Sequence, residues 1–424
     1  MLQKMQWVRG AAVSVALASA VVLGGCGGSN STNNNAPVAV YEFGQANFSD
    51  NTANRGQHPD VNTLGNSATS VAISDTGIVY IADTNNNRVL GFNALSSLSA
   101  GKADFVIGQA DFTSNTNTSV LNKPRKVSVA GTKLAIVDTG NNRVLVYNTL
   151  PSGTGAISPT PSAIIGKATT AADGSPAADT LYFPTGATFA GTNLIVADNG
   201  NNRVLIYTSV TTGAAATYVL GQRNFTSGPQ TPNCPADTVA VPDCTTSFAV
   251  TADSLNSPAD VWSDGSSLVV SDQANNRVLY WALVPTRNEQ PATRVIGQTS
   301  LKNQSGFGSS SSTLRQPNGV WSDRNTGYIY VADSGNNRVL AFNTPSADGQ
   351  GAVAVYGQGD YTHSTANDDN QDGNIDRDSN GRVVASNRTL YNPLGVVTFG
   401  SATVTNQVYI VDAGNARLMV YNTY

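Results

Sequence analysis

One short segment recurs six times along the chain, and this repetition constrains the fold more than any other feature. The copies read DTNNNRVLGFN, DTGNNRVLVYN, DNGNNRVLIYT, DQANNRVLYWA, DSGNNRVLAFN and DAGNARLMVYN. Each has Arg five residues after its Asp and an aromatic residue four after that Arg. The pairs are Asp83 and Arg88, Asp138 and Arg143, Asp198 and Arg203, Asp272 and Arg277, Asp333 and Arg338, and Asp412 and Arg417. Such internal repetition predicts a solenoid, a propeller or another array.

Each copy has the pattern of a β-hairpin. A β-rich run such as IVYIAD ends at the Asp, and another, such as VLVYN, follows the Arg. The residues between the two runs include Gly and Asn, which tolerate positive φ at low cost, so we expect them to form the turn. The runs alternate little between apolar and polar residues, as expected for strands buried on both faces. Sheets stacked face to face, as in propeller blades, meet that condition.

Two further strands flank each hairpin. Upstream lies a Leu-x-x-Pro segment, and Pro is tolerated at the first residue of a strand because no ladder donor is lost there. These prolines are Pro124, Pro184, Pro258, Pro317 and Pro393, whereas the first unit has Leu64-Gly65-Asn66-Ser67 instead. Downstream lies an apolar strand that ends in Gly-Gln in most units. Each unit is therefore predicted to be one four-stranded blade.

The two ends of the chain predict how the ring closes. Gly44-Gln45 ends a fourth strand that has no hairpin before it, and the sixth hairpin ends at Asn422 with no fourth strand after it. We therefore expect residues 38–45 to complete the sixth blade, which removes exposed sheet edges at the seam. The predicted fold of residues 38–424 is all-β, a six-bladed β-propeller with four-stranded blades.

The Asp-x-Gly-Asn-Asn-Arg-Val hairpin with its upstream Pro resembles the NHL repeat. Some copies depart from the pattern: Asn85 and Ala274 replace the Gly, and Ala416 replaces the second Asn. NHL propellers mostly bind proteins, RNA or sugars through one face, and some relatives are enzymes, including a peptidyl-amidating lyase and streptogramin lyases. The resemblance therefore implies the fold without fixing the function.

Residues 1–25 have the pattern of a lipoprotein signal peptide. Lys4 and Arg9 precede a short apolar stretch, and Leu23-Gly24-Gly25-Cys26 resembles the lipobox, which implies lipidation of Cys26. Ordinary cleavage after Ala18-Ser19-Ala20 is the alternative. Residues 26–37 are a polar, flexible tether. Gly27, rather than Asp, follows the lipidated residue, which implies export to the outer membrane of the cell envelope.

The two remaining cysteines form an even pair. In an exported protein, Cys234 and Cys244 are expected to form a disulfide bond, with two free thiols as the alternative.

An acidic insertion, DDNQDGNIDRDSNGR, is the best candidate for a metal site. It matches the first nine positions of an EF-hand-like loop, in which oxygen ligands bind calcium. The expected ligands are Asp368, Asn370, Asp372, Asn374 through its carbonyl, and Asp376, with Asp378 in a second overlapping loop. The twelfth position is Ser379 rather than a bidentate Glu, so a solvated acidic loop remains the alternative. We expect any calcium here to be structural.

The six Asp/Arg pairs allow two interpretations. They form a charged ring that binds a ligand, or each Asp caps its hairpin turn and pairs with the Arg. Six near-identical copies favour the structural interpretation, because a binding site would normally break the symmetry. The long connections between blades are then the variable surface, and they are expected on one face. Several begin with an aromatic residue, such as Phe48 or Phe112, that is expected to tuck under a blade edge.

These observations favour a non-catalytic envelope module that recognises a protein or a polysaccharide through its loop-rich face. The alternative is a propeller lyase or lactone hydrolase with a metal on the central axis. The chain has only two His, His58 and His363, so no catalytic residue is predicted. The net charge is −4 and the basic residues are scattered, which argues against nucleic acid as a partner.

Overall fold

The computed structural model describes residues 35–116, 120–166, 176–227, 250–304, 308–401 and 404–423. Its contacts divide the chain into two units, Met1–Thr32 and Asn33–Tyr424, and all the described residues belong to the second unit. The predicted signal peptide, Cys26, most of the tether and the Cys234/Cys244 pair lie outside the described residues, so the expectations for them stay predictions. Within the described ranges, no helix has the length and apolarity needed to cross a bilayer.

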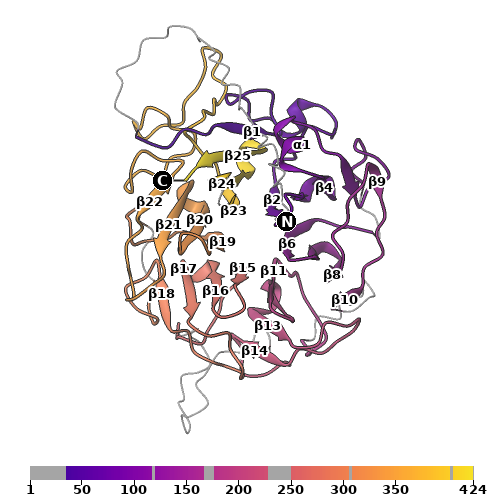
Figure 1. Cartoon of the computed structure of the whole chain (residues 1–424). Coiled ribbons are helices and arrows are strands. Elements are labelled where there is room, and N and C mark those ends of the chain that lie inside the picture. The colour runs from indigo at the N-terminus through magenta and orange to yellow at the C-terminus, as the bar shows by residue number, and fades with distance from the viewer. Residues whose placement is uncertain are drawn as a thin grey trace, which may run out of the picture. The chain divides into compact units, whose positions relative to one another are not determined.

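Six sheets, antiparallel except for one added strand in blade 1, surround a common axis, one for each predicted unit (Figure 1). Blade 1 contains β2 (Ala68–Ile73), β3 (Val79–Asp83), β4 (Arg88–Phe92) and β5 (Phe105–Ile107). Blade 2 contains β6 (Pro124–Ala130), β7 (Lys133–Asp138), β8 (Arg143–Tyr147) and β10 (Ala163–Ile165). Blade 3 contains β11 (Gly186–Ala190), β12 (Asn193–Asp198), β13 (Arg203–Tyr207) and β14 (Tyr218–Leu220). Blade 4 contains β15 (Pro258–Ser263), β16 (Leu268–Asp272), β17 (Arg277–Trp281) and β18 (Arg294–Ile296). Blade 5 contains β19 (Pro317–Ser322), β20 (Tyr328–Asp333), β21 (Arg338–Asn343) and β22 (Ala354–Tyr356). Blade 6 is β23 (Pro393–Ser401), β24 (Val404–Asp412), β25 (Arg417–Asn422) and β1 (Tyr41–Phe43).

The ring closes as the sequence predicts. The innermost strands contact one another in the order β2, β6, β11, β15, β19, β23 and back to β2. Strand β1 pairs antiparallel with β25, with Glu42 opposite Met419. The Phe43 ring also lies edge-on against Phe92 of blade 1, at 5.1 Å between ring centroids. The first and last parts of the propeller therefore share both a sheet and a core contact, which confirms the six-bladed fold.

Blade 1 departs from the four-stranded prediction. Strand β9 (Gly155–Ile157) comes from the connection between β8 and β10, and it pairs in parallel with β5 as a fifth strand. An added strand covers the outer edge of the sheet, which would otherwise present unpaired backbone groups. The short helix α1 (Leu95–Ser99) connects β4 to β5 in the same blade.

The cores lie between the blades. Every residue of β3 and β4 is buried, which explains why these strands do not alternate between apolar and polar residues. Residues of neighbouring blades meet in each core, as where Tyr80 and Val89 of blade 1 pack with Ile136 of blade 2.

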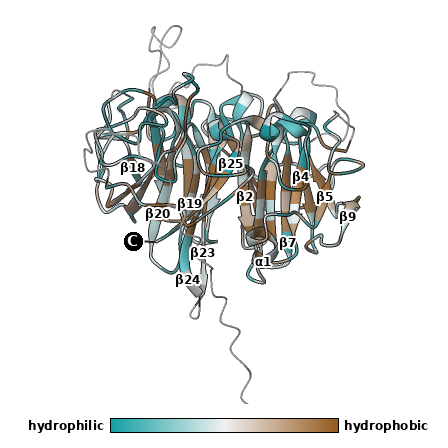
Figure 2. Cartoon of the chain, turned by 90° about the horizontal axis from the view of Figure 1, so that it is seen from above, coloured by the Kyte–Doolittle hydropathy of each residue, from teal (hydrophilic) through white to brown (hydrophobic). Residues whose placement is uncertain are grey.

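One side of the ring, here termed the turn face, carries the hairpin turns (Figure 2). The connections from each blade to the next lie on the same side, because they join the outer strand of one blade to the first residue of the next inner strand. Helix α1 lies on the opposite side. The turns are the 3₁₀ segments η2 (Thr84–Asn86), η3 (Thr139–Asn141), η4 (Asn199–Asn201), η5 (Gln273–Asn275), η6 (Ser334–Asn336) and η7 (Ala413–Asn415), and η1 (Ala53–Gly56) lies in the connection before blade 1.

Candidate functional site

All six repeated Asp/Arg pairs are ion pairs within their own blades. In each, the Arg Nε lies 2.7–2.8 Å from the Asp Oδ2. The paired side chains have no exposed surface, except that Arg143 is 14% exposed. We term these pairs, with the Asn residues that bind them, the hairpin network.

The Asp side chain does not cap its own turn, which corrects one detail of the prediction. In blade 3, the other oxygen of Asp198 accepts the backbone N–H of Tyr182, the residue after the Leu of Leu-x-x-Pro. The same bond recurs in every blade: Gly65 to Asp83, Asn122 to Asp138, Asn256 to Asp272, Arg315 to Asp333 and Tyr391 to Asp412. The carboxylate thus fixes the start of the inner strand, and it holds the turn through the side chain of Asn201 rather than through a backbone cap.

The Arg of each pair uses its remaining donors on the connections between blades. In blade 3, Arg203 donates Nη1 to the carbonyl of Phe225 and Nη2 to the carbonyls of Ala177 and Thr180. The Phe225 ring packs against the neighbouring core, so the aromatic residue that opens this connection is held at both its ring and its backbone. Counting Nε on Asp198, four of the five guanidinium donors of Arg203 therefore have acceptors within the protein.

The two Asn of the turn have separate tasks. In blade 3, Asn201 donates its amide to Asp198, and Asn202 has a φ of 51° and accepts the backbone N–H of Ser257 in blade 4. In blade 6, Ala416 takes the place of the second Asn, so the side-chain bond to the next blade, here blade 1, cannot form.

Glycine in the turn has a different role from the one predicted. The positive φ belongs to the second Asn of the Asn-Asn pair, as at Asn202, and not to Gly200. A Cβ on Gly200 would lie 2.4 Å from the Tyr182 ring, so close approach selects Gly there. The repeated residues of the hairpin network are thus occupied in holding the blades together.

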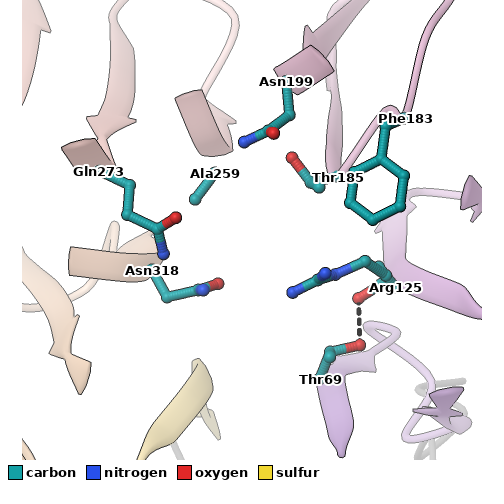
Figure 3. A pocket seen from close by; sticks show the side chains of 8 residues that line it. All are labelled: Thr69, Arg125, Phe183, Thr185, Asn199, Ala259, Gln273 and Asn318. Atoms are coloured by element: carbon teal, nitrogen blue, oxygen red, sulfur yellow. Dashed lines mark hydrogen bonds between the residues drawn. The ribbon is translucent and has the colours of Figure 1, made fainter. Parts of the chain in front are cut away.

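The first residues of the inner strands, which surround the axis and begin on the turn face, border a pocket of about 130 Å³. Figure 3 shows its lining side chains. The pocket is lined by Thr69, Arg125, Phe183, Thr185, Asn199, Ala259, Gln273 and Asn318, which come from blades 1 to 5. We term these residues the channel mouth. Arg125 is the only charged side chain among them, its guanidinium lies 5.8 Å from the centroid of the Phe183 ring, and burial lowers its pKa.

β-Bulges help aim these side chains. In five inner strands the pairing register shifts just after the first residue, as between Pro124 and Lys126. A bulge leaves one residue outside the ladder and can redirect its side chain. In β6 the two consecutive residues Arg125 and Lys126 both reach groups around the axis.

An ion pair crosses the axis close to the channel mouth. Lys126 Nζ of blade 2 lies 2.5 Å from Asp260 Oδ2 of blade 4, and the same oxygen accepts the N–H of Val320 in blade 5. Burial raises the pKa of Asp260, and the Lys126 ammonium acts in the opposite direction. This pair connects three blades that are not all neighbours.

Sequence reasoning missed the channel mouth and the Lys126/Asp260 pair, although a signal was available. The second residue after each leading position is Ser70, Lys126, Gly186, Asp260, Gly319 or Gly395. A Cβ on any of the three glycines would lie within 2.8 Å of a neighbouring inner strand, so this ring is narrow. Two opposite charges at a position otherwise held by small residues indicate a contact across the axis.

The acidic insertion of the fifth connection folds into successive turns around its own carboxylates. Asp368 accepts the backbone N–H groups of Asp372 and Gly373, and Asp378 accepts those of Asn380 and Arg382. Burial, followed by the nearby carboxylates of the insertion, raises the pKa of Asp376. Among the residues with described positions, no three His, Cys, Asp or Glu side chains form a group that could hold a metal ion. Calcium binding stays a prediction.

The two histidines lie in the connections between blades, and neither lines the channel mouth. His363 Nδ1 lies 2.8 Å from Asp360 Oδ1 within a single exposed turn, and His58 is exposed.

The comparisons with known proteins agree with the repeat pattern. The NHL repeat family matches residues 66–92 and 314–342. A streptogramin B lyase is 12% identical over 90% of this chain and 96% of its own, with a TM-score of 0.42. A catalytically inactive virginiamycin B lyase from Staphylococcus aureus with quinupristin is 10% identical over 91% and 99%, with a TM-score of 0.43. A protein of unknown function from Bacteroides thetaiotaomicron is 13% identical over 90% and 75%, with a TM-score of 0.49. No curated protein sequence matches the chain.

Proposed function

Because the chain is a six-bladed β-propeller with NHL repeats, we propose that it is a non-catalytic binding or scaffold module that recognises a protein or a polysaccharide through its turn face. The observation that supports this most is that its repeated polar residues are paired with one another, whereas other polar residues face a pocket. The hairpin network is buried and internally paired, whereas Arg125, Gln273 and Asn318 face a pocket on the turn face. A rigid ring that presents variable connections is a common arrangement for binding.

Exposed aromatic residues on the turn face add to this proposal. Tyr182 and Tyr391 are each 46% exposed and follow the Leu of Leu-x-x-Pro in blades 3 and 6. Each ring lies over the turn glycine of its own blade, Gly200 or Gly414. Rings held in this way lose little freedom on binding and offer a large contact area, which is why Tyr is enriched in interfaces.

We also propose that the module acts in the cell envelope, exported and held at the outer membrane by a lipid on Cys26. The proposal depends on the lipobox-like sequence and the polar tether. Labelling cells with radioactive palmitate tests it: the chain should take up label, and Cys26→Ser should not. Equal labelling of both forms would contradict it.

Binding by the turn face is tested by comparing variants on the two sides of the ring. The full chain is titrated against an array of envelope polysaccharides and against purified envelope proteins. Tyr182→Ala and Tyr391→Ala should weaken binding, whereas Leu283→Ala should not, since that exposed residue follows β17 on the opposite side. Equal effects of all three variants would contradict the proposal. Chemical conversion of the bound ligand would instead favour the alternative, a propeller lyase or lactone hydrolase with a metal on the axis.

A further inference from the structure

Arg125 departs most from the sixfold pattern of the channel mouth. The residue that follows the leading position of each inner strand is Thr69, Arg125, Thr185, Ala259, Asn318 or Leu394. Five of these positions carry neutral side chains, and one carries an always-charged guanidinium. A substitution that breaks the repeat at the axis, where a ligand can touch several blades at once, points to recognition rather than to blade structure.

The guanidinium of Arg125 has unused donors. Within the part of the chain that the structure describes, the guanidinium makes no hydrogen bond or ion pair, and it lies over the face of the Phe183 ring. Arg203, in the hairpin network, donates to a carboxylate and three carbonyls. A partly desolvated guanidinium gains most from a carboxylate, which it binds through two parallel hydrogen bonds.

Asp260, whose carboxylate lies at the axis, already has its partners. One oxygen of Asp260 accepts from Lys126 and from Val320, and the other accepts the backbone N–H of Val261. Arg125 and Lys126 together carry two positive charges against the one negative charge of Asp260. The described part of the channel mouth therefore keeps one positive charge that no protein group balances.

The rest of the lining suits a hydroxylated ring. The side-chain amides of Gln273 and Asn318 make no hydrogen bond to described residues, and each amide can both donate and accept. The Phe183 ring is 42% exposed and borders the same space, where it offers an apolar surface (Figure 3). The pocket is smaller than the roughly 300–1,000 Å³ of drug-sized sites, so it holds one unit of a longer ligand.

We propose that the channel mouth binds the carboxylate of a uronic acid unit in an acidic polysaccharide, with Arg125 on the carboxylate, Gln273 and Asn318 on the hydroxyls, and Phe183 against the ring. This inference rests on the proposed function and narrows it to one ligand class. An acidic peptide would also use the guanidinium, but it offers the two amides no hydroxyl groups from its acidic side chains and offers Phe183 no sugar ring.

The test titrates the full chain with three probes, tetramers of galacturonate, glucuronate and mannuronate, and with the methyl ester of each as a neutral match. At least one acidic tetramer should bind, and its ester should bind at least tenfold more weakly. Arg125→Gln should weaken binding of that tetramer by tenfold or more, because it removes the charge and the paired donors. Lys123→Gln, which removes an exposed charge two residues away, should change it by less than twofold.

Three outcomes would overturn the inference. They are no binding of any acidic tetramer, equal binding of acid and ester, and unchanged affinity in Arg125→Gln with unaltered thermal unfolding. A tetraglutamate peptide that binds in place of the tetramers would overturn the uronic acid and leave the proposed function standing. If the turn face of the full chain bound none of the glycans and proteins tested, the proposed function itself would be overturned.

Discussion

The hairpin network and the channel mouth share blades 1 to 5, yet they differ in how completely their polar groups are used. In the network, Asp198 binds Arg203, Asn201 and a backbone amide, and nothing is left for a ligand. At the mouth, Arg125 has donors and no described acceptor. The repeated residues form the scaffold, and the residues that differ between equivalent positions are available for recognition.

The two regions differ because the blades repeat the same structural contacts, whereas the axis is common to all of them. Each blade must fix its turn, its inner strand and its next neighbour, and the same physical problem is solved six times by the same residues. The axis is shared by all the blades, so a single departure there alters the whole opening. A ligand at the mouth can therefore be selected by one or two substitutions without any change to the blades.

The largest expected difference between the two regions is in stability. Arg203→Leu leaves Asp198 buried without its partner and should lower the free energy of unfolding by about 3–5 kcal/mol. Arg125→Leu should change it by no more than about 0.5 kcal/mol, because no described protein group depends on that guanidinium. Urea unfolding followed by tryptophan fluorescence measures both. Similar losses for the two variants would remove the distinction between scaffold and recognition residues.

Calcium tests whether the acidic insertion is a third kind of region, ordered by an ion rather than by repeated residues. Calcium at 100 times its Kd should add about 2.7 kcal/mol to the free energy of unfolding if it binds the folded chain alone. Asp372→Ser should abolish this gain, and Asp75→Ser, on an exposed turn of blade 1, should not. Thermal unfolding with calcium and with chelator gives the answer. Identical curves in the two conditions would contradict the calcium prediction.

The bond between neighbouring blades gives a smaller expected effect within the network. Asn276 has a φ of 52° and accepts the backbone N–H of Gln316 in blade 5. Asn276→Ala removes this acceptor and strains the left-handed backbone, so it should lower the free energy of unfolding by about 2 kcal/mol. Asn148→Ala, at an exposed residue outside the turn, is the matched control in urea unfolding. Equal behaviour of the two variants would show that the contact adds nothing measurable.

The smallest expected effect concerns Glu42, at a position where the other outer strands carry Val or Ile. Burial raises its pKa from 4.5 to about 7, and Arg417 Nη1, at 3.6 Å, only partly opposes this. The folded state therefore holds the proton more tightly than the unfolded state, and stability falls as the pH rises from about 4.5 to about 7.

Glu42→Gln should remove that pH dependence. It should raise the free energy of unfolding at pH 8 by about 1 kcal/mol, after allowance for screening by solvent. Urea unfolding at pH 5, 6, 7 and 8 compares the two proteins. A parallel pH profile in the variant would assign the effect to another group.

The fold was predictable because its determinants are local and repeated. The Asp-to-Arg spacing, the Leu-x-x-Pro start and the unmatched strand near Phe43 together indicated six blades and their closure. Strand β9 was not predictable, since it pairs with β5 of blade 1 although three strands of blade 2, β6, β7 and β8, lie between them in the chain. The positive φ of Asn202 and the close contact at Gly200 also required coordinates, because the sequence shows only that both residues recur.

The candidate site was harder to predict because its residues come together only when the ring closes. Arg125 and Asn318 are far apart in the chain and meet at the axis. What marks these two residues in the sequence is that they differ from the residues at equivalent positions of the other units. This difference becomes informative only after the roles of the repeated residues are known.

Hydrogen–deuterium exchange of the full chain, with and without the tightest-binding uronic acid tetramer, shows where on the ring the ligand sits. If the repeated residues form the scaffold and the channel mouth is the recognition site, exchange should slow in the first residues of β6 and β19 and in the turns η4 and η5. The side of the ring that carries α1 should not change. Protection confined to the α1 side, or spread evenly over the six hairpin turns, would refute this division between scaffold and site.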